Sequence, residues 1–316
     1  MRTGITAAAA GTWTLGDHNV NRMGFGSMRI TANPDRKLAI TVLRRAVELG
    51  VNHIDTAAFY FSPGGTLNVG TGPIRYATEL IREALAPYPD DLVITTKVGP
   101  DYDPATGFSE ATTPAQLRSQ VEENLRRLGR DHLEVVNLRI VKRPGRDSVA
   151  ERFGALAELR DAGLIRHLGL SNVRIDHLDE TQTIAPVVCV QNSYALDAHR
   201  TDDDFVKICG ERGIAFVPFF AIAGAGREAG AASDHGEAVR TVALAHAVTA
   251  HQVRLAWTLH QGPHVLAIPG TGDPDHLVAN IAAGALRLTD DELASLGDRR
   301  VGGVRRAGGA FVGTVA

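Results

Sequence analysis

The segment LVITTKV at residues 92–98 is followed by LEVVNLRI at residues 133–140, and these two runs decide the fold. Both are largely apolar without strict alternation, which is typical of strands buried on both faces of a parallel sheet. Between them, Thr113-Pro114 opens an apolar period of 3.6 residues that Gly129 ends, as expected for a helix. The pattern predicts a β-α-β unit with parallel strands.

The same alternation extends in both directions along the chain. The eight runs predicted as strands are residues 24–29, 51–57, 92–98, 133–140, 167–172, 187–194, 214–220 and 265–270. Helical patterns lie between them, and no change of composition suggests a linker. Eight such units predict an α/β protein with one closed (β/α)8 TIM barrel, in a single domain of residues 1–316.

Two segments lie outside the eight units. Residues 12–23 flank Gly16-Asp17, a turn signal, and predict an N-terminal β-hairpin that caps the bottom of the barrel. Residues 299–316 are rich in glycine and arginine. We expect a solvated tail there, and a loop that folds over a site is the alternative.

Composition narrows the class of partner. The chain has 33 basic and 36 acidic residues, a net charge of −3, so nothing indicates a nucleic-acid or membrane partner. No apolar run approaches the roughly 20 residues of a membrane helix. Cys189 and Cys209 are too few for a disulfide framework. We therefore expect a cytoplasmic protein that acts on a small molecule, with its oligomeric state open.

Metal-ligand spacing is absent from the sequence. His260 and His264 are four residues apart, but the intervening Gly262-Pro263 breaks the helix that such a pair requires. Asp101 and Asp103 begin a calcium-loop pattern that the following residues do not continue. We predict no metal site.

Polar residues stand where the predicted strands end. These are Asp55, Lys97, Arg139, Ser171-Asn172 and Gln191. The carboxyl ends of parallel barrel strands share one face, so these side chains should meet at the mouth of the barrel. Charges there are costly unless paired, and we expect Asp55, Lys97 and Arg139 to interact. The alternative is a salt-bridge cluster that only closes the barrel.

Tyr60 follows Asp55 by five residues, within the aromatic run 59–61. Two unit charges about 4 Å apart interact by about 4 kcal/mol at an effective dielectric constant near 20. A protonated Lys97 nearby would therefore stabilise an ionised phenol, and Asp55 would keep the lysine protonated. This makes Tyr60 a candidate general acid. Hydrophobic packing under a loop is the alternative.

At this point five motifs resemble those of the aldo-keto reductases, in family order and spacing between about residues 12 and 296. They are GVNHIDTA at 50–57 with Tyr60 following, ITTK at 94–97, GLSN at 169–172, QNSY at 191–194, and IPGT at 268–271 with Asn280 downstream.

The resemblance implies an enzyme that reduces an aldehyde or ketone by hydride transfer from NADPH, with NADH as the alternative. Tyr60 matches the proton donor, Lys97 its partner and Asp55 the partner of that lysine. The residues matching the cofactor site are Ser171, Asn172, Gln191, Phe219, Ala223, Gly224, Gly226, Arg227, Pro269, Gly270, Thr271, His276 and Asn280.

The sequence departs from the family pattern in two respects. Arg139 stands where the family usually has a catalytic histidine, and the strand VVNLR resembles a branch that includes pyridoxal reductases. An arginine can hold a carbonyl oxygen but cannot shuttle a proton. Gly270 and His276 stand where many members have cations for the 2′-phosphate. The start of the helix after Pro274 offers backbone donors for that group instead.

The expected substrate is a carbonyl compound, pyridoxal-like or a secondary metabolite. The alternatives are a cofactor-binding regulatory barrel with slow turnover, and a reductase of imines or C=C bonds. The predicted pocket wall, each member of which could simply pack, is Met28, Phe59, Phe61, Tyr102, Phe108, Val141 and Phe220.

Overall fold

The apolar runs form one curled parallel sheet in the computed structural model, which describes residues 4–297 except 68, 104, 142–143, 198–201 and 223–235. The predicted tail at 299–316 lies outside the described residues. The sheet has the order β13-β12-β11-β10-β7-β4-β3. Its strands are β3 (Phe25–Gly26), β4 (His53–Asp55), β7 (Val93–Val98), β10 (Leu133–Arg139), β11 (Ile165–Ser171), β12 (Val187–Gln191) and β13 (Ala215–Phe216).

Residues 265–267 close the sheet into a barrel. Val265 forms a parallel bridge with Phe216, and Ala267 forms one with Met23. Backbone bonds support both edges: Leu266 N–H donates to Phe216 O at 2.9 Å, and Gly24 N–H donates to Ala267 O at 2.8 Å. The fold is thus the predicted (β/α)8 barrel, with residues 265–267 as the eighth strand.

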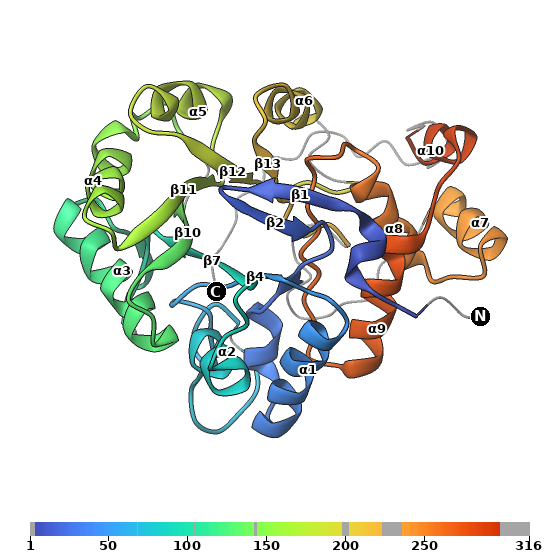
Figure 1. The fold of residues 1–316 in the computed structure, drawn as a ribbon, viewed down its shortest axis with the longest axis horizontal. Helices are drawn as coiled ribbons and strands as arrows, with labels where there is room; N and C mark the ends of the chain where they lie inside the picture. The colour runs from blue at the N-terminus through green and yellow to red at the C-terminus, as the bar shows by residue number, and fades with distance from the viewer. Residues whose placement is uncertain are drawn as a thin grey trace.

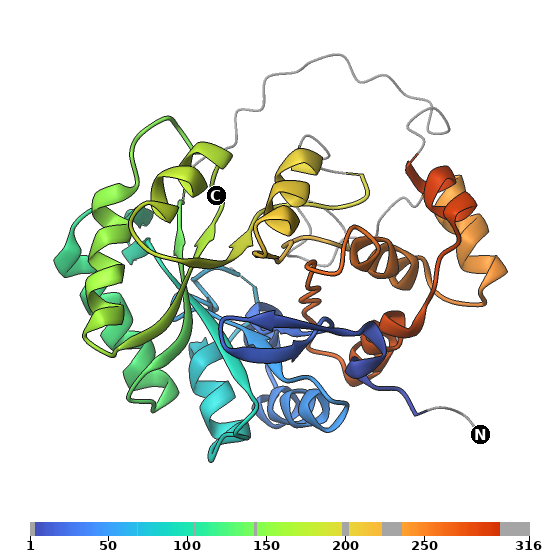
Figure 2. The same ribbon diagram turned by 45° about the horizontal axis from the view of Figure 1, so that its top comes forward.

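Helices surround the barrel on the outside, as Figures 1 and 2 show. They are α1 (Arg36–Glu48), α2 (Ala77–Leu85), α3 (Pro114–Leu128), α4 (Ala150–Asp161), α5 (Ile175–Gln182), α6 (Asp203–Glu211), α7 (Glu237–Ala245), α8 (Ala250–Leu259), α9 (Pro274–Ala282) and α10 (Asp290–Gly297). Short 3₁₀ helices are η1 (Ala7–Ala10), η2 (Met28–Ala32) and η4 (Ala283–Ala285). None of the helices in the described ranges is long and apolar enough to cross a membrane.

Several predicted strands are shorter than expected. The run 51–57 contains only β4, 187–194 contains only β12, and 265–270 contains the eighth strand at 265–267, while the largest differences lie in the first and seventh runs. The run 24–29 was predicted as one strand, but β3 ends at Gly26 and Met28 begins η2. Ile30 N–H donates to Ser27 O, which is a 3₁₀ hydrogen bond. A buried apolar residue such as Ile30 is compatible with a 3₁₀ helix as well as with a strand. The run 214–220 contains only the two residues of β13.

The predicted N-terminal hairpin is present and covers one end of the barrel. It consists of β1 (Thr12–Leu15) and β2 (His18–Asn21), paired antiparallel across Gly16 and Asp17. Leu15 and Val20 are fully buried in a cluster with inward-facing strand residues such as Val135. The hairpin lies across the middle of the view in Figure 1. Its partners Val93 and Val135 lie near the starts of β7 and β10, so the hairpin covers the barrel end opposite Lys97 and Arg139.

Two pairs of short strands follow the ends of β4 and β7, where the polar residues stand. β5 (Phe61–Ser62) pairs with β6 (Arg75–Tyr76), and β8 (Pro100–Asp103) pairs with β9 (Gly107–Glu110), both antiparallel. The first pair follows β4 and the second follows β7 along the chain.

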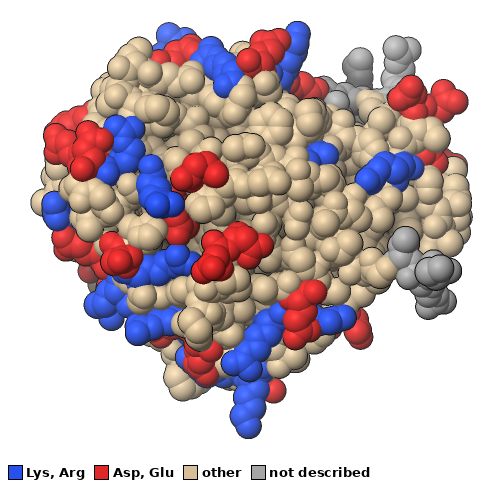
Figure 3. Space-filling model, viewed as in Figure 1, with Lys and Arg blue, Asp and Glu red and all other residues tan. Residues whose placement is uncertain are grey.

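On the face drawn in Figure 3, basic and acidic side chains are interspersed, in keeping with the small net charge.

Candidate active site

A buried ion pair lies at the mouth of the barrel, at the ends of two adjacent strands. Lys97 Nζ is 2.6 Å from Asp55 Oδ1 and donates to Thr56 O at 3.1 Å. Both charged side chains are almost fully buried, at 2% and 4% exposure. Strands β4 and β7 pair in register at Asp55 and Thr95. Lys97 follows Thr95 by two residues and shares its face of the strand, so the side chains of Asp55 and Lys97 meet inside the barrel.

The charge on Lys97 is secured by its neighbours. Burial by itself lowers the pKa of Lys97, but the negative charge of Asp55 and a smaller contribution from Tyr60 outweigh it, and the net pKa is raised. The lysine therefore stays protonated through the neutral range. A buried cation with a single carboxylate partner acts strongly on any group beside it.

Tyr60 is the group beside it. Lys97 Nζ lies 4.7 Å from the centroid of the Tyr60 ring, which is partly exposed. The Tyr60 backbone is fixed on both sides, since its N–H donates to Ala57 O at 3.0 Å and its carbonyl accepts from Ala77 N–H at 2.9 Å. The structure thus brings together three predicted residues: a partly exposed tyrosine, a buried lysine and a buried carboxylate.

Arg139 ends β10 and points to the residues predicted for the cofactor. Its Nη1 donates to Ser171 Oγ at 3.0 Å, and its guanidinium carbon lies 4.9 Å from the Phe219 ring centroid. The expected pairing at the mouth is therefore found between Asp55 and Lys97, whereas the contacts described for Arg139 run to β11 and Phe219. A guanidinium in this place presents fixed donors at the mouth.

Ser171 and Gln191 end neighbouring strands and are both fully buried. They pair in register between β11 and β12. Gln191 Nε2 donates to Asp55 Oδ2 at 2.5 Å, whereas its Oε1 is buried without a partner. A buried acceptor without a donor is costly, and an amide N–H₂ of a ligand would satisfy it. These residues fit a nicotinamide carboxamide. Asn172 follows at φ +56° and donates to Ile140 O at 2.7 Å.

The residues predicted for the adenosine end lie just before α9 and within it. Thr271 and Asn280 are buried, whereas His276 is exposed. The expectation that this helix start offers free backbone donors is wrong. The Asp273 carboxylate already accepts from Asp275 N–H at 2.8 Å and from His276 N–H at 3.1 Å.

Pro269 and Gly270 of the predicted cofactor site lie against the first barrel strand. Gly270 packs closely against the first strand, because a Cβ there would lie 2.5 Å from Gly26 O, and Pro269 O accepts from Gly26 N–H at 3.3 Å. These positions join the barrel as well as lining its mouth. The predicted loop residues Ala223, Gly224, Gly226 and Arg227 lie outside the described residues.

Most of the predicted pocket wall forms one aromatic cluster next to Tyr60. Ring centroids lie 5.1 Å apart for Phe59 and Tyr60, and 6.3 Å apart for Phe59 and Phe108. Tyr102 on β8 continues the cluster, 4.9 Å from Phe108 and 5.0 Å from Phe61. Phe220 belongs to a second group with Phe219, at 5.0 Å, and Met28 and Val141 are partly buried.

Sequence reasoning missed a polar layer beneath the ion pair. His53 and Asn137 are fully buried inside the barrel, two residues before Asp55 and Arg139. His53 Nε2 is 3.3 Å from Thr95 Oγ1, and Asn137 Oδ1 accepts from the Cys189 thiol at 3.1 Å. The period-two repeat of a strand carries this signal, since residues two apart share a face.

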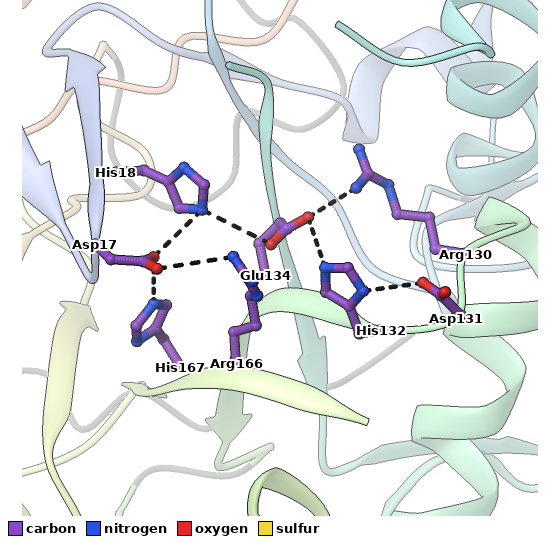
Figure 4. Close-up of polar contacts among 8 residues, drawn as sticks. All are labelled: Asp17, His18, Arg130, Asp131, His132, Glu134, Arg166 and His167. Atoms are coloured by element: carbon purple, nitrogen blue, oxygen red, sulfur yellow. Dashed lines mark hydrogen bonds and ion pairs between the residues drawn. The ribbon is translucent and has the colours of Figure 1, made fainter. Parts of the chain in front are cut away.

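A second polar cluster lies at the hairpin end of the barrel (Figure 4). Asp17 Oδ1 is 2.7 Å from His167 Nε2 and 3.3 Å from His18 Nε2, and Glu134 Oε1 is 2.7 Å from Arg130 Nη1. Within the described part of the chain, no group of three or more His, Cys, Asp or Glu side chains could hold a metal ion. These contacts join the hairpin to the strands.

Comparison with known proteins places the chain in a family. A model of the aldo/keto reductase family matches residues 11–298. The chain is 42% identical over 300 residues to the pyridoxine 4-dehydrogenase of Escherichia coli (strain K12), covering 91% of this chain and 98% of that protein. The chain belongs to the aldo/keto reductase family and is an oxidoreductase.

Solved structures agree with that assignment. An aldo-keto reductase from Klebsiella pneumoniae in complex with NADPH has a TM-score of 0.74 and 27% identity, covering 93% of this chain and 96% of that one. Another from the same organism, with NADP and acetate, has a TM-score of 0.75 and 26% identity, covering 94% and 97%.

Proposed function

We propose that this protein reduces an aldehyde or ketone with NADPH, and that Tyr60 is the proton donor. The observation that carries the proposal is the position of Lys97, paired with Asp55 at 2.6 Å and lying 4.7 Å from the Tyr60 ring centroid. A buried lysine and a buried carboxylate beside a partly exposed tyrosine at the mouth of a barrel are typical of a functional site.

The chemistry follows from what each side chain can do. NADPH, when bound, would supply the hydride. Tyr60 donates its phenolic proton to the carbonyl oxygen, and the charge of Lys97 stabilises the phenolate that remains. Asp55 keeps the lysine charged. Arg139 adds hydrogen-bond donors at the mouth that can hold the substrate oxygen.

Ser171, Asn172 and Gln191 would hold the nicotinamide, and Thr271 and Asn280 the adenosine end. The two Klebsiella pneumoniae structures contain NADPH or NADP, which supports the same cofactor here. We expect NADPH to bind more tightly than NADH, although Asp273 occupies the backbone donors at the start of α9. Fluorescence titration with both cofactors measures the preference, and equal or tighter NADH binding would contradict it.

A planar, pyridoxal-like aldehyde is the substrate that the site favours. The rings of Phe59, Tyr102 and Phe108 offer flat apolar surface beside Tyr60, and Arg139 offers donors for a polar ring substituent. The similarity to a pyridoxine 4-dehydrogenase supports the same class. A panel of pyridoxal, benzaldehyde and short aliphatic aldehydes under NADPH tests it. Faster turnover of aliphatic aldehydes would count against a planar substrate.

The replacement Tyr60→Phe tests the proton donor. It should lower kcat for reduction at least about 100-fold, because general acid catalysis is worth roughly 10²–10⁴-fold, and should leave NADPH affinity nearly unchanged. Tyr76→Phe is the matched control, since Tyr76 packs against Phe61 with ring centroids 5.2 Å apart. A Tyr60→Phe enzyme that keeps more than about a tenth of the wild-type rate would remove Tyr60 from this role.

A further inference from the structure

The two oxygens of Asp55 are held by different partners. Oδ1 pairs with Lys97 Nζ at 2.6 Å, and Oδ2 accepts from Gln191 Nε2 at 2.5 Å. All three side chains are almost fully buried. An ionised carboxylate only accepts hydrogen bonds, so the Gln191 amide must present its N–H₂ to Asp55. The orientation of the amide is thereby fixed by Asp55.

The oxygen of the same amide, Gln191 Oε1, lacks a hydrogen-bond donor among the described residues. Gln191 Oε1 is buried and has no hydrogen-bond partner. It can only accept, and the amide cannot turn over without placing its oxygen against the carboxylate of Asp55. The atom therefore calls for a donor from a ligand, and an acceptor in its place would be repelled.

We propose that Gln191 is a positioning residue that couples cofactor binding to the Asp55–Lys97 pair. One amide holds Asp55 in line with Lys97 through Nε2 and accepts from the carboxamide of the cofactor through Oε1. The inference rests on the proposed function, because it takes the cofactor to be a nicotinamide. It goes further in linking the two sites, so that a change at Gln191 alters turnover as well as binding.

The charged and titratable groups around Gln191 come from each neighbouring element. Arg139 lies next to this group through the uncharged Ser171. It donates to Ser171 Oγ, and Ser171 pairs in register with Gln191. Asp55 on β4 contacts Gln191 directly, and Lys97 on β7 pairs with Asp55. His53 on β4, Tyr60 after β4 and Cys189 on β12 interact electrostatically with members of this Asp55–Lys97 pair.

Two variants separate the inference from a merely structural role. Gln191→Met keeps the volume but loses both hydrogen-bonding groups. Gln191→Glu keeps the shape, and at low pH its carboxyl shares a proton with Asp55, because two adjacent carboxylates do not both ionise readily. The protonated carboxyl donates to Asp55 and still presents an oxygen acceptor, as the amide does. At high pH it becomes a second carboxylate and repels Asp55.

NADPH affinity is measured by fluorescence titration between pH 5.5 and 9, and kcat is measured at saturating NADPH. Gln191→Met should lose about tenfold or more in each quantity at every pH, since hydrogen bonds to charged groups are worth this much. Gln191→Glu should stay within about threefold of wild type at pH 5.5 and fall to the level of Gln191→Met by pH 9.

Cys189→Ala is the matched control, because Cys189 lies on the same strand and face and its thiol contacts Asn137 rather than Asp55. It should leave both quantities unchanged. A Gln191→Met enzyme with wild-type kcat, or a Gln191→Glu enzyme whose ratio to wild type does not vary with pH, would overturn the coupling. Should Gln191→Met not fold, the pH dependence of Gln191→Glu still decides.

The proposed function fails separately. If the wild-type enzyme reduces no carbonyl compound, or Tyr60→Phe retains activity, the reductase mechanism is wrong, and the NADPH titrations of the Gln191 variants still test the binding arm. If Tyr60→Phe is inactive while Gln191→Met turns over normally, only the coupling is wrong.

Discussion

His53 is a buried base directly beneath the ion pair at the barrel mouth. Its side chain is fully buried, with Nε2 3.3 Å from Thr95 Oγ1 and Nδ1 without a partner. Burial lowers the pKa of His53 to about 4, while the charge of Asp55 acts in the opposite direction and that of Lys97 in the same direction. The folded protein therefore holds this imidazole neutral at pH values where an exposed histidine is charged.

This residue should make the fold sensitive to acid. Between pH 6.5 and about 4 the unfolded chain binds a proton at His53 that the folded chain does not, so stability falls as pH falls. The loss begins near pH 6.5 and reaches about 3 kcal/mol near pH 4. Urea unfolding from pH 7.5 to 4.5 measures it. His53→Gln should flatten the dependence, and exposed His276→Gln should not. Equal slopes for all three proteins would contradict the prediction.

Residues at the site differ in how far the sequence could predict them. Asp55, Lys97 and Gln191 could be placed at one end, since parallel strands in a barrel share a polarity. The bond between Gln191 and Asp55 could not, because it joins positions 136 residues apart across the barrel. The direction of Arg139 toward Ser171 depends in the same way on packing that no local pattern records.

Among the elements, those with local caps could be predicted best. Helix α3 starts at Pro114 and ends at Leu128, as expected, because Thr113 and Gln116 form a capping box and Gly129 adopts φ +66°. The extent of the first barrel strand could not be predicted, since the burial of Ile30 is compatible with a longer β3 as well as with η2. Apolar periodicity reports burial and leaves backbone hydrogen bonding open over so short a run.

The hairpin β1–β2 offers a test at this scale (Figure 4). Gly16 has φ +68°, and a Cβ there would lie 2.4 Å from the His167 ring. Gly16→Ala should therefore destabilise the protein by about 2 kcal/mol, from backbone strain of about 1 kcal/mol plus displacement of the ring from Asp17. Urea unfolding measures the change.

Two comparisons make that result specific. Gly163→Ala isolates the strain, because Gly163 has φ +81° with nothing near its Cβ position, and should cost about 1 kcal/mol. Asp17→Asn should cost less than about 1 kcal/mol: the hydrogen bond from His167 lowers the pKa of Asp17, but the side chain is 58% exposed. A Gly16→Ala protein no less stable than Gly163→Ala would show that the contact with His167 is immaterial.

Arg22 joins segments from the two termini of the chain where the barrel closes. Its side chain donates to Ala10 O at 3.2 Å, Gly262 O at 2.7 Å and Val265 O at 3.1 Å, and also to Leu259 O. The bond to Val265 spans 243 residues. These acceptors lie in η1, at the end of α8, in the turn after α8 and in the eighth strand, so one guanidinium joins the segment before the first barrel strand to the last strand.

Arg22→Met should therefore loosen the closure of the barrel. The replacement keeps an apolar stem but leaves four carbonyl groups without this donor. Net losses of roughly 1 kcal/mol for each bond give a destabilisation of about 3–4 kcal/mol. The Arg22 side chain is partly buried, so its bonds to the carbonyl groups replace bonds to water. This burial, with a smaller contribution from Arg287, lowers the pKa of Arg22.

Urea unfolding and the thermal midpoint measure this loss. Arg22→Lys should fall between wild type and Arg22→Met, because an ammonium has three donors in place of five. Arg45→Met is the control: Arg45 pairs with Glu48 at 3.0 Å on the surface, where an ion pair contributes about 0.5 kcal/mol or less. If Arg22→Met were no less stable than Arg45→Met, the bridges at Val265 and Ala267 would hold the barrel closed without Arg22.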